Sequence, residues 1–182
     1  MIYGEGIRFR APERSDIPLF QQWVNDPDVQ AGTTHFLPMS IAREEEWFEA
    51  MLKRPPETHV FTAEIEQNGN WTAIGNGGFF EFDWIARRAT LGIMIGEPVF
   101  RGKGHGTKMM EMLLKIGFEK FNLNRIALDV LSNNPRAIHV YQKIGFILEG
   151  TARQDQFKNG EYLDLHTMGI LRNEWLMMQD NG

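Results

Sequence analysis

The chain has 182 residues, of which 42% are hydrophobic and 24% are charged, and its formal net charge is −5 at pH 7. This length predicts one domain over residues 1–182, and the acidic balance argues against nucleic-acid binding, which needs a basic face. The sequence contains no cysteine, which excludes disulfides, thiolate zinc sites and an acyl-cysteine intermediate.

Three further classes of protein are disfavoured. The five histidines show no metal-ligand spacing, so we expect no metal site. No apolar run reaches membrane-spanning length, and the first residues lack the basic and apolar regions of a signal peptide. We therefore predict a cytoplasmic protein with no membrane partner.

The first third of the chain predicts a strand and two helices. Residues 7–10 alternate in polarity, which is typical of an edge strand. Ser15 and Asp16 can cap the first helix, and Ser40 can cap the second, which Pro55-Pro56 would end. Two helices are therefore expected after the first strand.

The segment between these helices, residues 30–39, shows no periodicity and predicts a loop. Loops of this kind commonly line binding sites, although a plain connector is equally allowed. His35 is notable only because this loop would border such a pocket, and we expect a surface or loop position for it.

The rest of the chain predicts strands interrupted by two helices. Asn68-Gly69-Asn70 and Asn159-Gly160 are hairpin turns, and Pro135 and Gly145 bound a helix. The strands are expected over residues 59–66, 71–82, 89–95, 126–130, 146–157 and 162–171, and the helices over 104–121 and 135–144. The order β-α-α-β-β-β-α-β-α-β-β predicts an α/β protein with a mixed, mostly antiparallel sheet of about seven strands and helices on both faces.

The segment Arg101-Gly102-Lys103-Gly104-His105-Gly106-Thr107 is the most informative of the chain. Its glycines leave backbone N–H groups open at the start of a helix, where the helix dipole also attracts phosphate. Arg101, Lys103 and Lys108 add mobile positive charge at the same place. The segment therefore predicts a phosphate-binding loop.

Two better-known glycine loops do not fit this segment. A P-loop needs Gly-Lys-Ser/Thr, whereas Gly106 is followed by Thr107 and then Lys108. A dinucleotide fingerprint needs a glycine three positions after the second, where this chain has Met109.

A second informative segment is Asn134-Pro135-Arg136-Ala137-Ile138, which starts a helix that carries Tyr141 one to two turns later. Asn134 is a typical helix cap, and proline suits the first helical position. A phosphate cradle together with a well-placed acid indicates group transfer from a phosphate-bearing carrier.

These motifs, Arg101-x-x-Gly104-x-Gly106 and Asn134-x-x-Ala137-Ile138-x-x-Tyr141-x-Lys143-x-Gly145-Phe146, resemble those of the GNAT superfamily of acetyl-CoA-dependent N-acetyltransferases. The chain is most similar to the branch that holds ribosomal-protein N-terminal acetyltransferases and spermidine acetyltransferases. Further matches spanning nearly the whole chain are Ile7-Arg8-Phe9-Arg10, Asn159-Gly160-Glu161-Tyr162-x-Asp164 and Glu174-Trp175. The resemblance implies a single GNAT-like domain that uses acetyl-CoA and no metal.

The resemblance also implies how the carrier is held. In this family the strand before the glycine loop splays from its neighbour, and its exposed backbone groups bind the pantetheine arm and polarise the thioester carbonyl. That role would belong to the main chain of Ile93, Met94 and Ile95. The pyrophosphate would be bound by the loop residues Arg101, Gly102, Lys103, Gly104, His105, Gly106 and Thr107.

The remaining roles belong to side chains. Asn134 would also hydrogen-bond the carrier, and Arg136 would lie near its nucleotide end. Tyr141 is the expected acid, since a neutral phenol, with a pKa of about 10, can donate a proton to a departing thiolate. Glu81 is the candidate base for the amine and Asp83 the runner-up, on the premise that apolar neighbours raise the pKa of the carboxyl.

The acceptor is left open between two kinds of amine. We favour a protein or peptide N-terminal amine. Its pKa, about 7.7–8.0, is lower than the value of about 10.4 for polyamine and lysine amines, so it needs less help from a base. A polyamine would prefer a groove lined by carboxylates, for which Glu44, Glu45, Glu46, Glu81 and Asp83 are available, although the first three predict a solvated stripe. A non-catalytic acyl-CoA sensor is the rival from another class, and a homodimer is the expected assembly.

Overall fold

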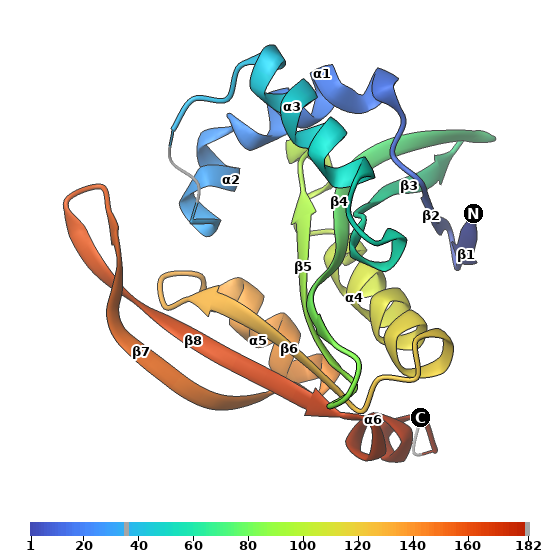
Figure 1. Ribbon diagram of the computed structural model, residues 1–182, viewed down its shortest axis with the longest axis vertical. Coiled ribbons are helices and arrows are strands. Elements are labelled where there is room, and N and C mark those ends of the chain that lie inside the picture. Colours follow the sequence, from blue (N-terminus) through green and yellow to red (C-terminus); the bar gives the residue numbers. More distant parts are fainter. Residues whose placement is uncertain (35–36, 181–182) are drawn as a thin grey trace.

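The computed structural model describes residues 1–34 and 37–180, and within them eight strands form one mixed sheet (Figure 1). The strand order is β1-β2-β3-β4-β5-β6-β8-β7, and all neighbours are antiparallel except β5 and β6. The strands are β1 (Ile2–Gly4), β2 (Ile7–Arg10), β3 (Phe61–Gln67), β4 (Asn70–Asp83), β5 (Arg88–Ile95), β6 (Arg125–Leu131), β7 (Ile147–Lys158) and β8 (Glu161–Leu171).

Helices cover both faces of this sheet, as predicted. The side chains of Phe79 and Phe80 show this best, because neighbouring residues of a strand point to opposite faces. Phe79 belongs to the core under α4, whereas Phe80 packs against the α1–α3 cluster. The helices are α1 (Ile17–Val24), α2 (Pro27–Gly32), α3 (Ile41–Leu52), α4 (His105–Lys115), α5 (Pro135–Ile144) and α6 (Arg172–Asp180), with short turns η1 (Arg14–Asp16), η2 (Pro56–Thr58), η3 (Pro98–Phe100) and η4 (Ile116–Lys120).

The main core lies between α4 and the sheet. Met109, Met110, Leu113 and Leu114 of α4 are fully buried there, whereas Glu111 on the same helix faces solvent. The methionines therefore fill the core, as expected of their flexible side chains.

The structure differs from the predicted elements in three places. A short exposed strand, β1, precedes β2, so residues 7–10 are not at the edge of the sheet. The predicted loop from residue 30 begins inside α2, whose start is fixed by the Asp26 cap and Pro27. The chain ends in α6, which sequence periodicity did not reveal. His35 lies outside the described residues.

Three further expectations about the helices have different outcomes. Ser40 caps α3 as predicted, since its hydroxyl accepts from the Arg43 N–H. The side chain of Asp16, in contrast, does not cap α1, because it is committed to Arg10. Glu44 is buried in α3 rather than solvated, and burial raises the pKa of its carboxyl.

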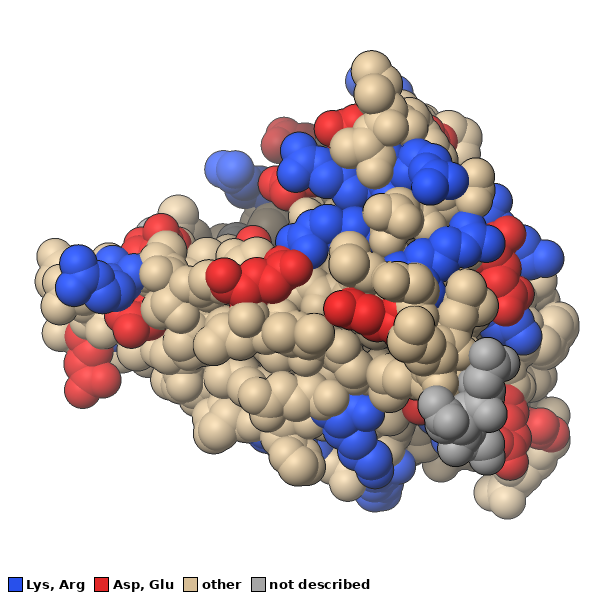
Figure 2. All heavy atoms as spheres, turned by 90° about the horizontal axis from the view of Figure 1, so that it is seen from below, with Lys and Arg blue, Asp and Glu red and all other residues tan. Residues whose placement is uncertain are grey.

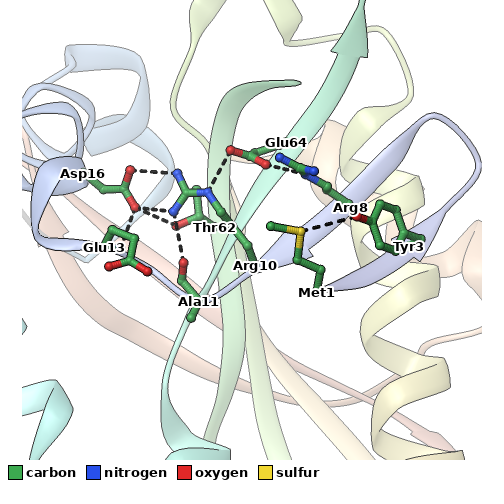
Figure 3. Close-up of polar contacts among 9 residues, drawn as sticks. All are labelled: Met1, Tyr3, Arg8, Arg10, Ala11, Glu13, Asp16, Thr62 and Glu64. Carbon is green, nitrogen blue, oxygen red and sulfur yellow. Dashed lines mark hydrogen bonds and ion pairs between the residues drawn. The ribbon is translucent and has the colours of Figure 1, made fainter. Parts of the chain in front are cut away.

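A buried ionic network joins β2, β3 and the start of α1 (Figure 3). The Arg10 guanidinium donates to both Asp16 oxygens at 2.6 and 2.8 Å, and its Nε donates to Glu64 at 2.8 Å. Glu64 also accepts from Arg8 at 2.6 Å. Burial opposes ionisation of Asp16, but the hydrogen bonds from Arg10 and from the Glu13 N–H outweigh it and lower the pKa of this carboxyl.

The surface carries both signs of charge. Figure 2 shows Lys and Arg side chains interspersed with Asp and Glu on the face seen from below, beside a broad uncharged area. No helix in the described part of the chain is long and apolar enough to cross a membrane.

Candidate active site

The strands β5 and β6 pair only at their beginnings. Residues 88–90 pair in parallel with residues 125–127, after which β5 follows β4 as far as Ile95 and β6 follows β8 as far as Leu131. Among the described residues, positions 91–95 of β5 therefore have no strand partner on the β6 side. The strands part at the place that the resemblance implied (Figure 1).

The glycine loop has the backbone that its sequence requires. Gly102 and Gly104 have φ of +81° and +84°, and Gly104 is the N-cap residue of α4. Because glycine offers no side chain, no capping hydrogen bond to α4 is found among the described residues. The first N–H groups of the helix are therefore open to an anion.

Two cations of this loop lie where the sequence did not predict them. The Arg101 guanidinium donates to Asp26, Asp28 and two backbone carbonyls, so it is not a mobile charge. Lys108 points to the other side of α4 and donates to the Glu5 carbonyl at 3.0 Å. Each side chain is thus engaged by partners within the fold, and the phosphate role of Arg101 stays a prediction.

Two further cations belong to this region, Lys103 in the loop itself and Arg136 at the start of α5. Arg136 lies so close that a methyl group built on Gly102 would meet its Nη2 atom at 2.9 Å. Lys103 is exposed, with its Nζ atom 5.8 Å from the Phe100 ring centroid. Burial and the charges of Lys108 and Lys103 lower the pKa of His105, which keeps its ring neutral near pH 7.

Asn134 begins α5 as predicted. Its Oδ1 atom accepts from the Ala137 N–H at 3.1 Å, and Gly145, with φ of +105°, ends the helix. The amide nitrogen of Asn134 lies close to Gly32 at the end of α2. The side-chain oxygen of Asn134 thus caps α5, and its side-chain nitrogen lies beside the end of α2.

A loop cavity of about 390 Å³ lies where the open N–H groups point. It is bounded by the end of β5, the glycine loop and α5, and Asp28 stands at its margin. Its lining includes Ile93, Ile95, Arg101, Gly102, Gly104, Gly106, Thr107, Asn134, Arg136 and Tyr141. Most of the predicted carrier-binding residues therefore come together around one space.

A gap cavity of about 370 Å³ occupies the opening between β5 and β6. Thr33 and Thr34 line it from the end of α2, Thr90 from β5 and Asp129 from β6. Ile93, Asn134 and Tyr141 line both this cavity and the loop cavity. The two spaces therefore meet at the tyrosine.

Tyr141 occupies this junction with its ring in the core. The ring packs near Phe146, at 6.1 Å between centroids, and burial raises the pKa of the phenol to about 12. No hydrogen bond to its hydroxyl is found within the described part of the chain, so the group is free to donate to a ligand. Its proton is retained over the working pH range of most enzymes.

The two carboxylates proposed as bases have different surroundings. Glu81 sits at a bulge of β4 with φ of +52°, is exposed, and accepts from the Thr90 hydroxyl at 2.9 Å. The apolar environment expected for it is therefore absent, although Thr90 joins it to the gap cavity. Asp83 caps the following turn by accepting from the Ala86 N–H and pairs with Arg88.

Sequence reasoning missed Asp129, the carboxylate that lines the gap cavity. It lies on β6 between the buried Leu128 and Val130, and its Oδ1 atom accepts from Thr167 at 2.7 Å. The alternation of β6 could have shown that Asp129 faces away from the main core. Nothing in the sequence could have shown that β5 turns away at that level.

The arrangement places an anion-binding loop, a strand with free backbone groups and a protonated phenol around two joined spaces. Such a site can bind a phosphorylated thioester on one side and a nucleophile on the other, with an acid at the junction. No cluster of His, Asp or Glu in the described ranges could hold a metal ion.

Known proteins are similar to this chain in sequence and fold. A spermidine N(1)-acetyltransferase of Vibrio cholerae serotype O1 is 28% identical over 93% of this chain and 95% of its own length. The crystal structure of a spermidine N-acetyltransferase from Vibrio cholerae with CoA and spermine has a TM-score of 0.86 at 29% identity, covering 94% of this chain and 98% of that one. A dodecameric structure of spermidine N-acetyltransferase from that organism has a TM-score of 0.80 at 28% identity, covering 94% and 96%.

The family is shown by a match to a family model. Residues 7–147 match the model of the acetyltransferase (GNAT) domain, which is more than half of the chain and includes the glycine loop, α5 and Tyr141. The fold expected from the resemblance agrees with that of the solved relatives. The chain therefore belongs to the GNAT acetyltransferases and is an N-acetyltransferase with acetyl-CoA as its co-substrate.

Proposed function

We propose that this protein transfers the acetyl group of acetyl-CoA directly to a primary amine of a small polyamine such as spermidine. The observation that carries the proposal is that Tyr141 and Ile93 line both the loop cavity and the gap cavity. A thioester bound from one side and an amine bound from the other would meet there. Acetylation within a ternary complex needs no acyl-enzyme, which suits a chain without cysteine.

The loop cavity would bind the carrier. Its pyrophosphate would accept from the open N–H groups at the start of α4, with Lys103 and Arg136 neutralising its charge. The pantetheine arm would run along the free side of β5, using the main chain of Ile93, Met94 and Ile95. The thioester carbonyl would then lie beside these backbone groups, whose N–H donors stabilise the charge of the tetrahedral intermediate.

Tyr141 would act as the acid. The amine nitrogen forms a bond to the carbonyl carbon, and collapse of the intermediate breaks the bond from carbon to sulfur. The phenol donates its proton to the departing sulfur, and the proton lost by the amine can restore it through solvent. A raised phenol pKa keeps the proton in place until the thiolate forms.

The gap cavity would bind the acceptor. Asp129 offers a carboxylate to one ammonium group of a polyamine, while a second, neutral amine approaches the thioester. Glu81 would take up the proton of the attacking amine through the Thr90 hydroxyl, which lines the cavity and donates to that carboxylate. The N-terminal peptide amine favoured from sequence is now the second choice, because the full-length relative acts on spermidine.

The proposal covers the whole chain as one acetyltransferase domain in the cytoplasm. A homo-oligomer is also part of it, supported by the dodecamer of a relative, and the homodimer predicted from sequence is the smallest form. Glu45 and Glu46 line a surface groove on α3 rather than the gap cavity, so they are not part of the proposed acceptor site.

The test is the release of coenzyme A thiol with a panel of acceptors. Spermidine, spermine, a simple monoamine and a short peptide with a free N-terminus are compared at saturating acetyl-CoA. We expect the highest kcat/KM for a polyamine, with mass spectrometry showing one added acetyl group. A higher kcat/KM for the peptide would return the assignment to the N-terminal amine.

A second outcome would place the protein in another class. If calorimetry detects coenzyme A binding but no acceptor in the panel releases thiol above the uncatalysed rate, the protein is a sensor of the carrier. The panel should therefore be run next to a coenzyme A titration of the same preparation.

A further inference from the structure

The side chain of Arg101 makes contacts that a phosphate ligand would not require. Its Nε atom donates to the Ile95 carbonyl at 3.1 Å and its Nη2 atom to the Gly96 carbonyl at 2.6 Å. The same guanidinium pairs with Asp26 at 3.0 Å and with Asp28 at 3.1 Å. Only 19% of the Arg101 side chain is exposed, so its fork of donors is directed into the protein.

The partners of Arg101 belong to the two walls of the site. Ile95 ends the part of β5 that lines the loop cavity. Asp26 caps α2 by accepting from the N–H groups of Asp28 and Val29, and the opposite end of α2 leads to Thr33 in the lining of the gap cavity. One side chain therefore connects the strand that would hold the carrier with the helix that borders the acceptor space.

The helix between these walls is too short to hold its own position. It has six residues, with Val29 as its buried side chain, and isolated helices of this length are unstable in water. Desolvation opposes the charge of Asp26, but donation from the Val29 N–H and pairing with Arg101 outweigh it and lower the pKa of that carboxyl. The ion pair therefore remains charged and attached at neutral pH.

A second cation holds the other end of α2. Lys158, at the tip of the β7–β8 hairpin, donates to the carbonyls of Gln30 and Thr33. A positive charge is favourable at a helix C-terminus, where backbone carbonyls lack partners. The helix is thus fixed at both ends by side chains from elsewhere in the chain, and Arg101 is the one that also contacts the carrier strand.

We propose that Arg101 is a positioning residue, whose side chain fixes α2 against the end of β5 and so keeps the acceptor wall in place, rather than a ligand of the pyrophosphate. The inference rests on the proposed transfer to an amine. It separates the roles within the loop: backbone N–H groups, Lys103 and Arg136 face the carrier, whereas Arg101 acts on the acceptor through Asp26.

The test compares Arg101→Gln and Asp26→Asn with Lys103→Gln. Asparagine still offers an oxygen to cap α2 but loses the ion pair. We expect both test variants to raise KM for spermidine about tenfold at saturating acetyl-CoA, the size of a contact within one network. Calorimetry should give a Kd for coenzyme A within about threefold of the wild type. The double variant should raise the KM for spermidine no further than the more impaired of the two single variants does.

The matched control changes a cation of the same loop that lacks these contacts. Lys103→Gln should weaken coenzyme A binding and leave KM for spermidine unchanged at saturating acetyl-CoA. If Arg101→Gln instead weakens coenzyme A binding tenfold or more while Asp26→Asn has no effect on KM for spermidine, Arg101 is a phosphate ligand and the inference is overturned.

Hydrogen exchange keeps the inference testable if no amine proves to be a substrate. Amides of residues 28–32 should exchange faster in Arg101→Gln and Asp26→Asn than in the wild type, but not in Lys103→Gln. Unchanged exchange would refute the positioning role whatever the acceptor. If a test variant fails to fold, Asp28→Asn takes its place, because the Asp28 side chain is 85% exposed and pairs with the same guanidinium. It should speed the exchange of the same amides by a smaller factor.

Discussion

The loop cavity and the gap cavity have similar volumes but are built in different ways. The loop cavity is bordered by the three glycines of one loop, where a phosphate would meet the open N–H groups of α4, together with residues of α2, β5 and α5. The gap cavity collects side chains from α2, β5, β6, α5 and β8. Recognition on the first side therefore depends on main-chain geometry, and on the second it depends on which side chains are present.

This difference sets how each side responds to mutation. Backbone donors persist through most substitutions, whereas a change at Thr33, Thr90 or Asp129 alters the gap cavity directly. The acceptor can consequently vary among relatives that keep the same carrier. Tyr141 belongs to both cavities, so it should show the largest effect of any single side chain.

Removing the hydroxyl of Tyr141 tests the junction of the two cavities. We expect Tyr141→Phe to lower kcat by about 10²–10³-fold, the usual contribution of a general acid. The ring still fills its place in the core, so the Kd for coenzyme A should remain within about twofold. Stopped-flow thiol release and calorimetry measure the two quantities, and an unchanged kcat would transfer the acid role to water.

A methyl group at Gly104 tests the main-chain character of the loop cavity. Gly104→Ala should weaken coenzyme A binding about tenfold, because a left-handed backbone disfavours a side chain and the new group holds phosphate away from the N–H donors. Gly160→Ala is the matched control, since its φ of +88° and open surroundings are nearly the same as at Gly104. It should lose about 1 kcal/mol of stability without affecting the carrier.

A neutral residue at Asp129 tests the side-chain character of the gap cavity. Asp129→Asn should raise KM for spermidine about five- to tenfold, which is the loss expected for one charge-assisted contact. A monoamine should be affected less, because it has no second ammonium group. Asp155→Asn, an exposed carboxylate on β7 outside both cavities, is the control. Equal effects on spermidine and the monoamine would argue that Asp129 has no role in recognition.

The ionic network around Arg10 contributes no residue to the lining of either cavity. Substitutions in it should therefore leave the Kd for coenzyme A and the KM for spermidine unchanged. Asp16→Asn should nevertheless destabilise the fold by about 2 kcal/mol, because it removes one of the two carboxylates, Asp16 and Glu64, that neutralise the largely buried Arg10 guanidinium. Glu49→Gln, in the exposed pair with Arg14, should cost less than about 1 kcal/mol. Urea unfolding at pH 7 measures both, and similar losses would mean that burial does not strengthen the Arg10 pair.

The pH dependence of stability gives the same network a second test. The pKa of Asp16 is lower in the folded state, so its contribution is complete above the unfolded value of about 3.9. That contribution is lost as the pH falls below 3.9 and through the folded pKa. The difference in unfolding free energy between wild type and Asp16→Asn should therefore shrink between pH 5 and pH 2.

The glycine loop and the start of α5 were predictable from sequence because their signals are local. Gly104 and Asn134 act within a turn or two of their own helices, so their spacing alone indicates the loop and the cap. The gap cavity was not predictable in the same way. Asp129 and Thr33 are far apart in the chain, and only the parting of β5 from β6 places them around one cavity.

Long side chains were the other source of error. Arg101 and Lys108 stand in a motif that indicates phosphate, yet their charged ends reach Asp26 and the Glu5 carbonyl. Glu44 follows a polar pattern and is nevertheless buried. A flexible side chain of three or four carbons can reach several partners, and sequence spacing does not show which of them lies nearest.

The parting of β5 from β6 also bears on aggregation. An unpaired strand edge at the margin of a sheet can template the addition of strands from other chains. Here the unpaired part of β5, in the described residues, faces inward between two strands of the same sheet. A strand from another chain would have to enter between β5 and β6 to pair with this edge. The unpaired edge is thus kept away from the margin of the sheet, where the addition of foreign strands takes place.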